Sequence, residues 1–554
     1  MIHVNNPRQT LLFDRVEEIL HPSAKARLDA DWPGIFRRAI LEMMPIEDIG
    51  ESFSYNFGRP TKEHFSICGL ILLKDYFGWT NEETIDHYLY DLKIQYALKI
   101  QVDNLKLGAR TLERYLKIFR EKELAQKIMK DVTEMIIKEL NIEVNKQRLD
   151  STHVFSNMAD WTRSMLLFKT TKRFLIQVKR HELKLYSELD NDLRKSYDSQ
   201  GDWIYREITT RNVCYGDHVC SNKEQIAWDM LRLIEKFEQH EKLSNMNSFK
   251  DMARVFGEQC EINDGKVKIR NKPGGSAMVN PSDPDASIDN KGVGYQVQVS
   301  ETYNPENPVQ IITAALPQTA SEADQTSLEP MLEEMAKVDA IPETLLADSG
   351  YGSDGNVSKL AKIDIELIAP TTGKDKKKVG LEECTLDDQQ RVITCPCDKR
   401  PMLKRYIGEK GRAVFPASTC QKCPLLKRCS ASKQGQNYTI IYDARSLRLR
   451  ERRLHEKTEE FQDDYRPRGG IEALFGRLKQ FTPLRRLGVR GKSAVFNAMN
   501  SIMAVHNIMQ MTEFYKIQDA KRQKSSIIMT KTSHSTSLVY QLCRLIHLEI
   551  SMAA

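Results

Sequence analysis

The sequence predicts an α/β protein: a mixed β-sheet flanked by helices, with an N-terminal helical domain, a helical insertion and a cysteine-rich insertion. Three observations lead to this class. Strand-like stretches alternate with helix-like ones over residues 282–370. The segments before residue 141 and from 160 to 281 carry helical patterns with few strand signals, and five cysteines cluster between Cys395 and Cys429. A chain of 554 residues is also too long for one hydrophobic core.

Residues 1–140 form the expected N-terminal helical domain. A helix-like run begins at His64, and Thr80-Asn-Glu-Glu83 has the pattern of a capping box that starts a second helix. Further helices are expected near residues 110–122 and 121–140. Short helices with tight turns fit a DNA-binding module of the helix-turn-helix type, although an ordinary helical bundle is the commoner cause of this pattern.

The first strand of the sheet is expected at residues 142–149, ending in Asp150-Ser-Thr-His153. An aspartate at a strand end projects from the sheet edge, where an active site can form, although an aspartate in a turn or helix cap is the commoner case. His153 is expected to orient its neighbours or to pack. Residues 160–281 are the helical insertion, and Asp283, Asp285 and Lys291 are expected to have loop roles.

A second aspartate follows another expected strand. Residues 294–300 alternate with period two, and residues 308–315 are expected to pair with them. A helix at 327–338 leads to the strand 343–347, which ends in Asp348-Ser-Gly-Tyr-Gly352. The sheet and its helices are therefore assigned to residues 141–159, 282–370 and 455–515.

An acid flanked by cations stands later in the chain. Tyr465, Arg468, Glu472 and Lys479 follow one another at offsets of three, four and seven residues. On one helix these offsets place all four side chains along a single stripe. A carboxylate among cations suits a site that holds a metal ion and a polyanion together; the alternative is a surface helix with salt bridges.

The cysteine-rich insertion covers residues 371–454. A Cys-x-x-Cys pair with further cysteines nearby can supply four thiolates to one metal ion. Zinc is the first candidate, an iron–sulfur cluster the second, and reduced cysteines without metal the third. Four of five candidates would bind, with Cys395 against Cys397 left open; the five are Cys395, Cys397, Cys420, Cys423 and Cys429.

Charge and targeting signals add further expectations. The net charge of +6 is modest, but residues 374–378, 445–453 and 466–490 are locally basic, which suggests phosphate contacts or a solvated face. Residues 516–554 are expected to be a basic tail with a final helix. No apolar run reaches membrane-spanning length and no secretory signal is visible at the start, so a cytoplasmic protein without a membrane partner is expected.

Three motifs together resemble the DDE-type transposases of bacterial insertion sequences. They are Asp150-Ser-Thr-His153, Ala347-Asp348-Ser-Gly-Tyr-Gly352, and the stretch from Tyr465 to Lys479 with its Tyr-Arg-Glu-Lys spacing. The resemblance extends from about residue 50 to 510. The insertion after Asp150 and the cysteine-bearing segment depart from the family pattern, but neither contains one of the three acids.

The resemblance implies an RNase H-like catalytic core and DNA cleavage and joining with Mg²⁺ or Mn²⁺. Asp150, Asp348 and Glu472 would be the catalytic metal ligands, with Asp150 bridging two ions about 3.5–4 Å apart. Arg468 and Lys479 would contact phosphates, and Tyr465 a base or a phosphate.

The implied partners are double-stranded DNA at the element ends and at the target, and further copies of the chain in a homo-oligomer on DNA, within a bacterial nucleoid. Two alternatives stay open: a nuclease that cuts without joining, and a DNA-binding protein that does not catalyse.

Overall fold

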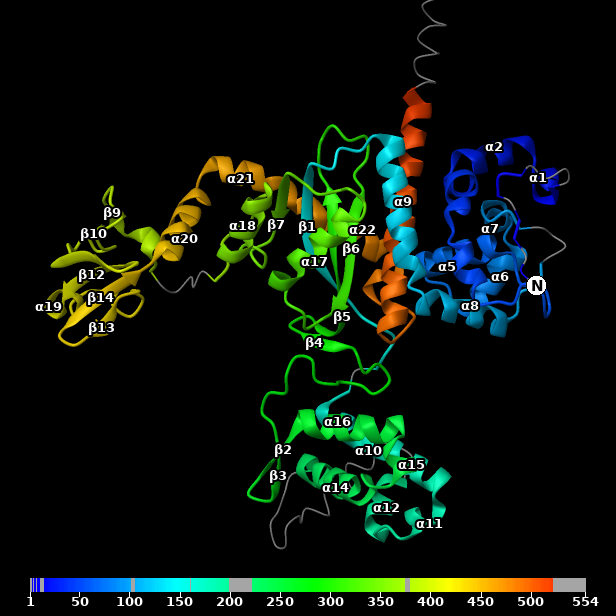
Figure 1. Cartoon of the computed structure of the whole chain (residues 1–554), viewed down its shortest axis with the longest axis horizontal. Helices are drawn as coiled ribbons and strands as arrows, with labels where there is room; N and C mark the ends of the chain where they lie inside the picture. Colours follow the sequence, from blue (N-terminus) through cyan, green and yellow to red (C-terminus); the bar gives the residue numbers. More distant parts are fainter. Residues whose placement is uncertain are drawn as a thin grey trace, which may run out of the picture. The chain divides into compact units, whose positions relative to one another are not determined.

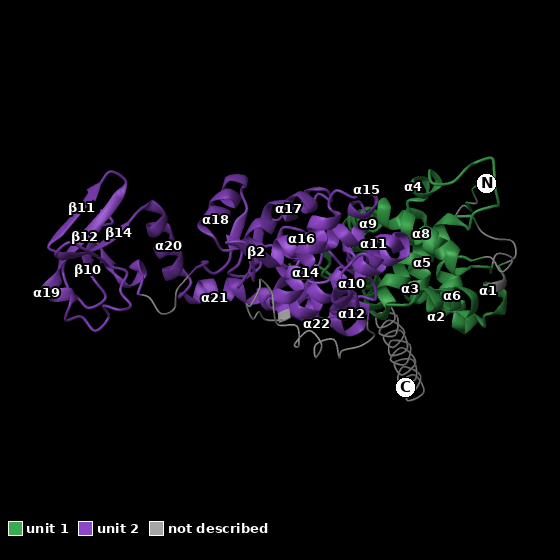
Figure 2. Cartoon of the chain, turned by 90° about the horizontal axis from the view of Figure 1, so that it is seen from below, with its two compact units in different colours: residues 1–143, 304–312, 500–554 green, residues 144–303, 313–499 purple. Residues whose placement is uncertain are grey.

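The computed structural model describes residues 2, 4–5, 7–9, 14–100, 105–159, 161–198, 222–373 and 379–521. The chain divides into two compact units, which Figure 2 distinguishes by colour. Unit 1 comprises residues 1–143, 304–312 and 500–554, and unit 2 comprises residues 144–303 and 313–499. The basic block at 374–378 and almost all of the expected tail at 516–554 lie outside the described residues. In the part that is described, no helix has the length and apolar character needed to cross a membrane.

Unit 1 is helical. Its elements are α1 (Arg15–Ile19), α2 (Pro22–Ala30), α3 (Trp32–Ile35), η1 (Phe36–Ile40), η2 (Leu41–Met43), α4 (Ile46–Gly50), α5 (His64–Phe77), α6 (Asn81–Tyr90), α7 (Leu92–Ala97), α8 (Ala109–Glu121) and α9 (Leu124–Leu140). Residues 492–521 are also helical, and those from 500 onward belong to this unit. The expected helices are therefore confirmed in kind.

Local chemistry explains where two of these helices begin. The predicted capping box is confirmed: the Thr80 side chain accepts the N–H of Glu83, and the Glu83 side chain accepts the N–H of Thr80. Glu123 has a φ of 50°, a left-handed conformation that separates α8 from α9. The helix predicted to run from residue 121 therefore starts at Leu124.

Unit 2 contains a mixed β-sheet with the strand order β4-β5-β1-β7-β8, and β6 also pairs with β5 (Figure 1). Strand β1 pairs antiparallel with β5 and parallel with β7, which in turn pairs parallel with β8. The strands are β1 (Lys146–Val154), β4 (Ser287–Asp289), β5 (Gly292–Thr302), β6 (Ile312–Thr319), β7 (Thr344–Ala347) and β8 (Glu366–Ile368). The predicted α/β class is confirmed, but β6 starts four residues later than the expected position 308.

The register of β1 corrects one prediction and explains another. Asp150 does not end its strand, because β1 continues to Val154 and Asp150 pairs with Val299 of β5. On its other side, β1 pairs with β7 only as far as Leu149 and Ala347, and Asp348 follows directly. The two aspartates therefore stand side by side where β7 stops and β1 continues.

Alternating side chains of β1 face opposite layers. Leu149 is buried among apolar residues of α17 (Asp324–Ala336), including Leu328 and Met331. The neighbouring Arg148 instead donates to the Pro467 carbonyl at 2.9 Å. Asp150 shares the Arg148 face, so its carboxylate points toward the segment around residue 467.

The segment between β1 and β4 has a hydrophobic core of its own, which includes Phe174, Ile226 and Met252. It consists of α10 (Arg163–His181), α11 (Leu183–Ser187), α12 (Asn191–Asp198), α14 (Asn222–Phe237), α15 (Glu241–Ser244), α16 (Asn247–Gln259), β2 (Cys260–Asn263) and β3 (Lys266–Ile269). The hairpin of β2 and β3 adds strand structure to a segment expected to be helical.

The cysteine-bearing segment is a small β-structure with its own buried cluster around Phe415 and Ile440. Its elements are η5 (Leu381–Glu383), β9 (Thr385–Leu386), β10 (Val392–Thr394), β11 (Leu403–Ile407), β12 (Lys410–Pro416), α19 (Ala417–Cys420), β13 (Ser432–Gln434) and β14 (Asn437–Tyr442). Helix α20 (Ala444–His455) follows β14 directly. The division of the chain into five parts with the boundaries given above stays a prediction.

Candidate active site

Arg468 joins two of the three predicted acids. Its guanidinium donates to Asp150 at 2.6 Å and to Glu472 at 2.5 Å. The third acid, Asp348, lies within electrostatic range of both Asp150 and Arg468. Side chains that are up to 322 positions apart in the sequence therefore meet in unit 2.

The stretch from Tyr465 to Lys479 is not one helix, as the spacing predicted. Helix α21 (Glu459–Tyr465) ends at the tyrosine, a 3₁₀ turn η6 (Arg466–Gly469) follows, and α22 (Gly470–Phe481) carries the glutamate and the lysine. Pro467 lacks the N–H that an uninterrupted helix would use, which favours the break. The turn brings Arg468 over Asp150 while it keeps Glu472 within reach.

The electrostatics of the site follow from burial and crowding. Burial raises the pKa of Asp150 to about 6; the charges of Asp348 and Asp324 also raise it, while Arg468 and the N–H of Ser151 oppose the shift. A buried carboxylate prefers its neutral form unless cations compensate its charge. One guanidinium faces several carboxylates here, so the site attracts further positive charge.

Asp324 is a carboxylate at this site that the sequence reasoning missed. A Cβ on Gly350 would lie 2.8 Å from an Asp348 oxygen and 3.2 Å from an Asp324 oxygen, so the two carboxylates face each other across this glycine. Gln298, buried on β5, donates to Asp324 at 2.9 Å and accepts from Tyr351. The sequence pattern predicts this helix from residue 327, whereas α17 begins at Asp324. An acidic residue in the first turn of the helix is the signal that could have identified Asp324.

The loop after Asp348 is held by arginines that were expected to be available for phosphates. Arg452 of α20 donates to the carbonyls of Gly352 at 3.0 Å and Ala369 at 3.1 Å. In the same helix Arg448 pairs with Asp354 at 2.6 Å. These two arginines of the basic run 445–453 thus contact carbonyl and carboxylate groups of the same chain.

The remaining predicted residues lie around this group. Tyr465 stacks on Phe461 and is within electrostatic range of Arg468 and all three predicted acids. Lys479 is close instead to Lys291 and Arg485. His153 is buried and contacts Asp289 at 3.1 Å; no described contact joins it to Asp150.

The acids fit a divalent metal ion in donor chemistry. Carboxylate oxygens are the ligands that Mg²⁺ and Mn²⁺ prefer. Among the residues that the structure describes, however, no group of three or more His, Cys, Asp or Glu side chains is arranged so that it could hold a metal ion. Arg468 bonds both Asp150 and Glu472 in this arrangement.

The five predicted cysteines gather in one subdomain. The Sγ atoms of Cys397 and Cys423 are 3.4 Å apart, and this contact together with burial raises the pKa of Cys397 to about 11. Burial and the neighbouring thiols also raise the pKa of Cys420 and Cys429. Thiolates are common zinc ligands. Among the described residues, however, the cysteines are not arranged so that three or more of them could hold one metal ion.

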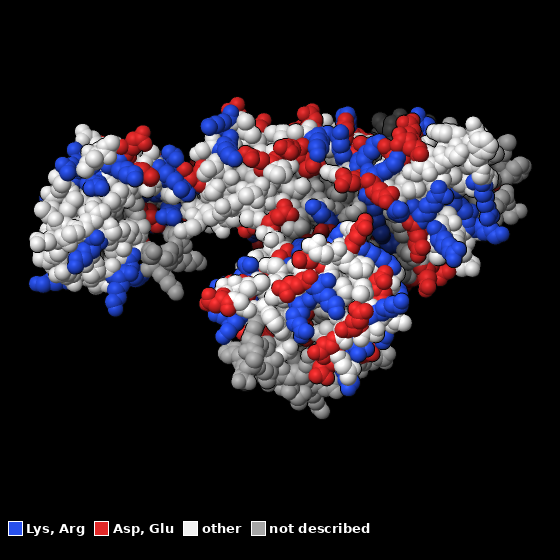
Figure 3. Space-filling view, turned by 60° about the horizontal axis from the view of Figure 1, so that its bottom comes forward, with Lys and Arg blue, Asp and Glu red and all other residues white. Residues whose placement is uncertain are grey.

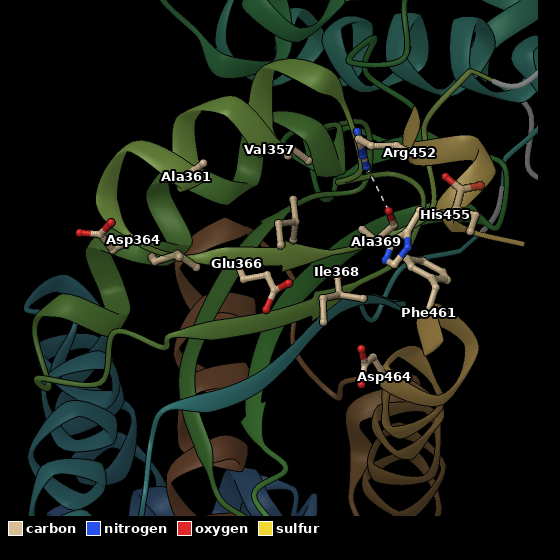
Figure 4. A pocket seen from close by; sticks show the side chains of 13 residues that line it. Val357, Ala361, Asp364, Glu366, Ile368, Ala369, Arg452, His455, Phe461 and Asp464 are labelled. Atoms are coloured by element: carbon tan, nitrogen blue, oxygen red, sulfur yellow. Dashed lines mark hydrogen bonds between the residues drawn. The ribbon is translucent and has the colours of Figure 1, made fainter. Parts of the chain in front are cut away.

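A pocket of about 570 Å³ lies elsewhere in unit 2 and contains none of the predicted site residues (Figure 4). It is lined by β8 and by parts of α18 (Asp354–Leu360), α20 and α21. Arg452 reaches across it to the Ala369 carbonyl. On the face of the molecule drawn in Figure 3, basic and acidic side chains are intermixed, so this view identifies no single DNA-binding face.

One family model matches a part of the sequence that contains one of the three predicted acids. Residues 394–512 match the family model described as Transposase DDE domain. This segment contains Glu472 but neither Asp150 nor Asp348, and for that part of the chain it confirms the resemblance to DDE-type transposases. The origin in a bacterial insertion sequence stays a prediction.

Two further comparisons, with curated proteins and with solved structures, add no argument about this chain. No curated protein matches the chain. Among solved structures, the cryo-EM structure of the piggyBac transposase synaptic complex with hairpin DNA matches at 10% identity and a TM-score of 0.20, covering 64% of this chain and 78% of that chain. A likeness of this size supports no inference about fold or function.

Proposed function

We propose that the chain is a DDE-type transposase that binds the terminal inverted repeats of a mobile element, cleaves the DNA there and joins the freed 3′-hydroxyl ends to target DNA. One observation carries the proposal: Arg468 bonds Asp150 and Glu472, with Asp348 beside them. The motifs imply that Asp150, Asp348 and Glu472 belong to one site, and these three acids, although distant in the sequence, lie close together.

The strand arrangement supports an RNase H-like core. The first strand has an antiparallel neighbour on one side and two successive parallel strands on the other, with α17 before β7 and α18 before β8. Asp150 lies on the first strand and Asp348 directly after the next parallel one. Because β1 and β7 pair only as far as Leu149 and Ala347, the residues that follow on the two parallel strands lie side by side.

The proposed chemistry has two balanced steps. Water adds to a phosphodiester at the element end, the P–O bond to the 3′ oxygen breaks, and a 3′-hydroxyl and a 5′-phosphate result. That hydroxyl then attacks a target phosphodiester, which forms one new P–O bond and releases one 3′-hydroxyl of the target. Bound Mg²⁺ or Mn²⁺ supplies the charge that activates the attacking oxygen and stabilises the phosphoryl oxygens.

The side chains have separate roles in this proposal. Asp150, Asp348 and Glu472 would hold the divalent cations. Arg468 is half-buried against the acids and offers planar N–H groups to a phosphate. Lys479 contributes a point charge about two turns along α22 from Glu472, and Tyr465 stacks on a base or donates to a phosphate.

A strand-transfer assay tests the proposal. Purified full-length protein, Mg²⁺ and a duplex with the element's terminal inverted repeat should yield cleaved ends and products joined to a target plasmid. Cleavage without joining would favour the nuclease alternative. Binding without either reaction would favour a non-catalytic DNA-binding protein.

The N-terminal helices are a second place where DNA contact is proposed. Helices α5 to α8 have the short lengths and tight turns of a helix-turn-helix module, and α8 is strongly amphipathic with exposed arginines on its outer side, such as Arg110. A helical bundle that only supports the fold is the competing interpretation. A protein that lacks residues 1–143 but retains cleavage of a terminal repeat would favour that interpretation.

We expect the stability of the metal-free protein to depend on pH through Asp150. Because its pKa is raised to about 6, the folded state holds a proton that the unfolded state loses near pH 4. Stability from this group is therefore fully present below about pH 4, falls as the pH rises through 6, and is level above that. The difference in unfolding free energy between wild type and Asp150→Asn, measured with EDTA from pH 4.5 to 8, should change by about 2 kcal/mol. A difference that does not vary with pH would contradict the burial of this carboxylate.

For the cysteine cluster we propose zinc bound by four of the five thiolates. Elemental analysis of the purified protein should find about one zinc per chain. Cys423→Ser should release it, because Cys423 touches Cys397. Cys260→Ser is the matched control, since Cys260 is buried in the helical insertion. Iron with visible absorbance would indicate a cluster instead, and no metal would leave the cysteines reduced.

A further inference from the structure

The turn between β4 and β5 is built to hold one lysine in place. The Asp289 carboxylate accepts the backbone N–H of Lys291 at 2.6 Å and that of Gly292 at 2.9 Å. The other oxygen of the same carboxylate contacts His153 Nδ1 at 3.1 Å. His153 is buried on β1, three residues from Asp150. The strand that carries a predicted catalytic acid therefore also fixes this turn, on which Lys291 is exposed.

Phe155 brings a second segment to the same turn. A Cβ on Gly292 would lie 3.1 Å from the Phe155 ring, so the turn packs directly on this ring. The Phe155 N–H donates to the Arg485 carbonyl at 3.2 Å. The Arg486 guanidinium lies 5.5 Å from the ring centroid. The β4–β5 turn and the end of η7 (Pro483–Arg485) thus both contact Phe155.

Lys479 completes a group of three cations. It is half-buried on α22, and Lys291 and Arg485 are the charged neighbours that act on it, so that burial and these cations lower its pKa. Within the described part of the chain, no carboxylate lies at salt-bridge distance from any of the three. Cations held close together with no carboxylate at salt-bridge distance repel one another, and an anion between them lowers that cost.

The position of this group indicates which anion it binds. Glu472 and Lys479 are seven residues apart on α22, which corresponds to about 10 Å along a helix axis. A DNA strand whose scissile phosphate lies at the acids would place a phosphate one or two nucleotides away within reach of these long side chains. We propose that Lys291, Lys479 and Arg485 form a binding site for such a backbone phosphate of DNA. The inference rests on the proposed function and adds Lys291 and Arg485 to the residues that the motifs assign.

The salt dependence of DNA binding tests the site. The probe is a fluorescent duplex with the element's terminal repeat, bound by the full-length protein in EDTA at 50 to 300 mM NaCl. Lys291→Gln should weaken binding by about three- to tenfold at 150 mM and reduce the slope of log K against log salt by about 1. Lys291→Glu should weaken binding further. Lys337→Gln is the control, because Lys337 is an exposed lysine on the same unit that pairs with Glu334.

The variant Asp289→Asn distinguishes the effect of the β4–β5 turn geometry from the effect of the Lys291 charge. It keeps Lys291 but weakens the acceptor that holds its N–H, so binding should fall while the salt slope stays near that of wild type. Lys291 variants that bind like Lys337→Gln at every salt concentration would overturn this inference alone. A wild-type protein that does not bind the duplex would overturn the proposed function together with it.

Discussion

Asp150→Asn, Asp348→Asn and Glu472→Gln should each lower DNA cleavage and joining by roughly a hundredfold or more, because a neutral amide cannot replace a carboxylate that binds a divalent cation. Asparagine and glutamine keep the shape of the side chain, so the fold should persist. The measurement is the rate of strand transfer in Mg²⁺ with a pre-cleaved terminal repeat, which isolates the joining step.

The design of these variants separates catalysis from binding. Affinity for the uncut duplex should stay within about threefold of wild type, since phosphate contacts dominate DNA affinity. Glu366→Gln is the matched control: Glu366 is an exposed acid on β8 of the same sheet. Full activity in Asp150→Asn or Glu472→Gln would refute the catalytic assignment, and equal loss in the control would point to unfolding instead.

Gly352→Ala should destabilise unit 2 by about 3 kcal/mol or more. A Cβ at this position would lie 1.9 Å from the Pro370 carbonyl oxygen and 2.9 Å from the carbonyl carbon. Both are backbone atoms, so the loop itself would have to move rather than a side chain. The Gly352 carbonyl also accepts from Arg452, and that bond would be strained with it. Thermal and denaturant unfolding of the full-length protein measure the effect.

Gly355→Ala is the companion variant, three residues away in α18. Its Cβ would meet nothing closer than the Ser353 Oγ at 3.9 Å, and alanine favours a helix over glycine by roughly 0.5–1 kcal/mol. It should therefore be neutral or stabilising. If both variants had the same effect, the close approach of Gly352 to Pro370 would not be what limits this position.

Several features of this protein could be predicted because they depend on neighbouring residues. The capping box at Thr80 needs only a hydroxyl and a carboxylate three residues apart, and the helices of unit 1 need only periodic apolar positions. The α/β class follows from the alternation of strand and helix patterns. The acids Asp150, Asp348 and Glu472 were singled out because each stands in a short motif with a defined spacing.

Other features depend on residues that meet only in three dimensions. Strand β1 continues beyond Asp150 because it pairs with β5, and no local sequence pattern indicates this pairing. Asp324 joins the acids through Gly350 and Gln298, and Arg452 is committed to two carbonyls although its run looked available for phosphates. Local sequence thus determined which residue types occur in which helix or strand, whereas strand register and long-range hydrogen bonds decided which charges face one another. The reason is physical: the energy of a charge depends on the partners and solvent within a few ångströms, and the folded chain brings those partners from distant positions.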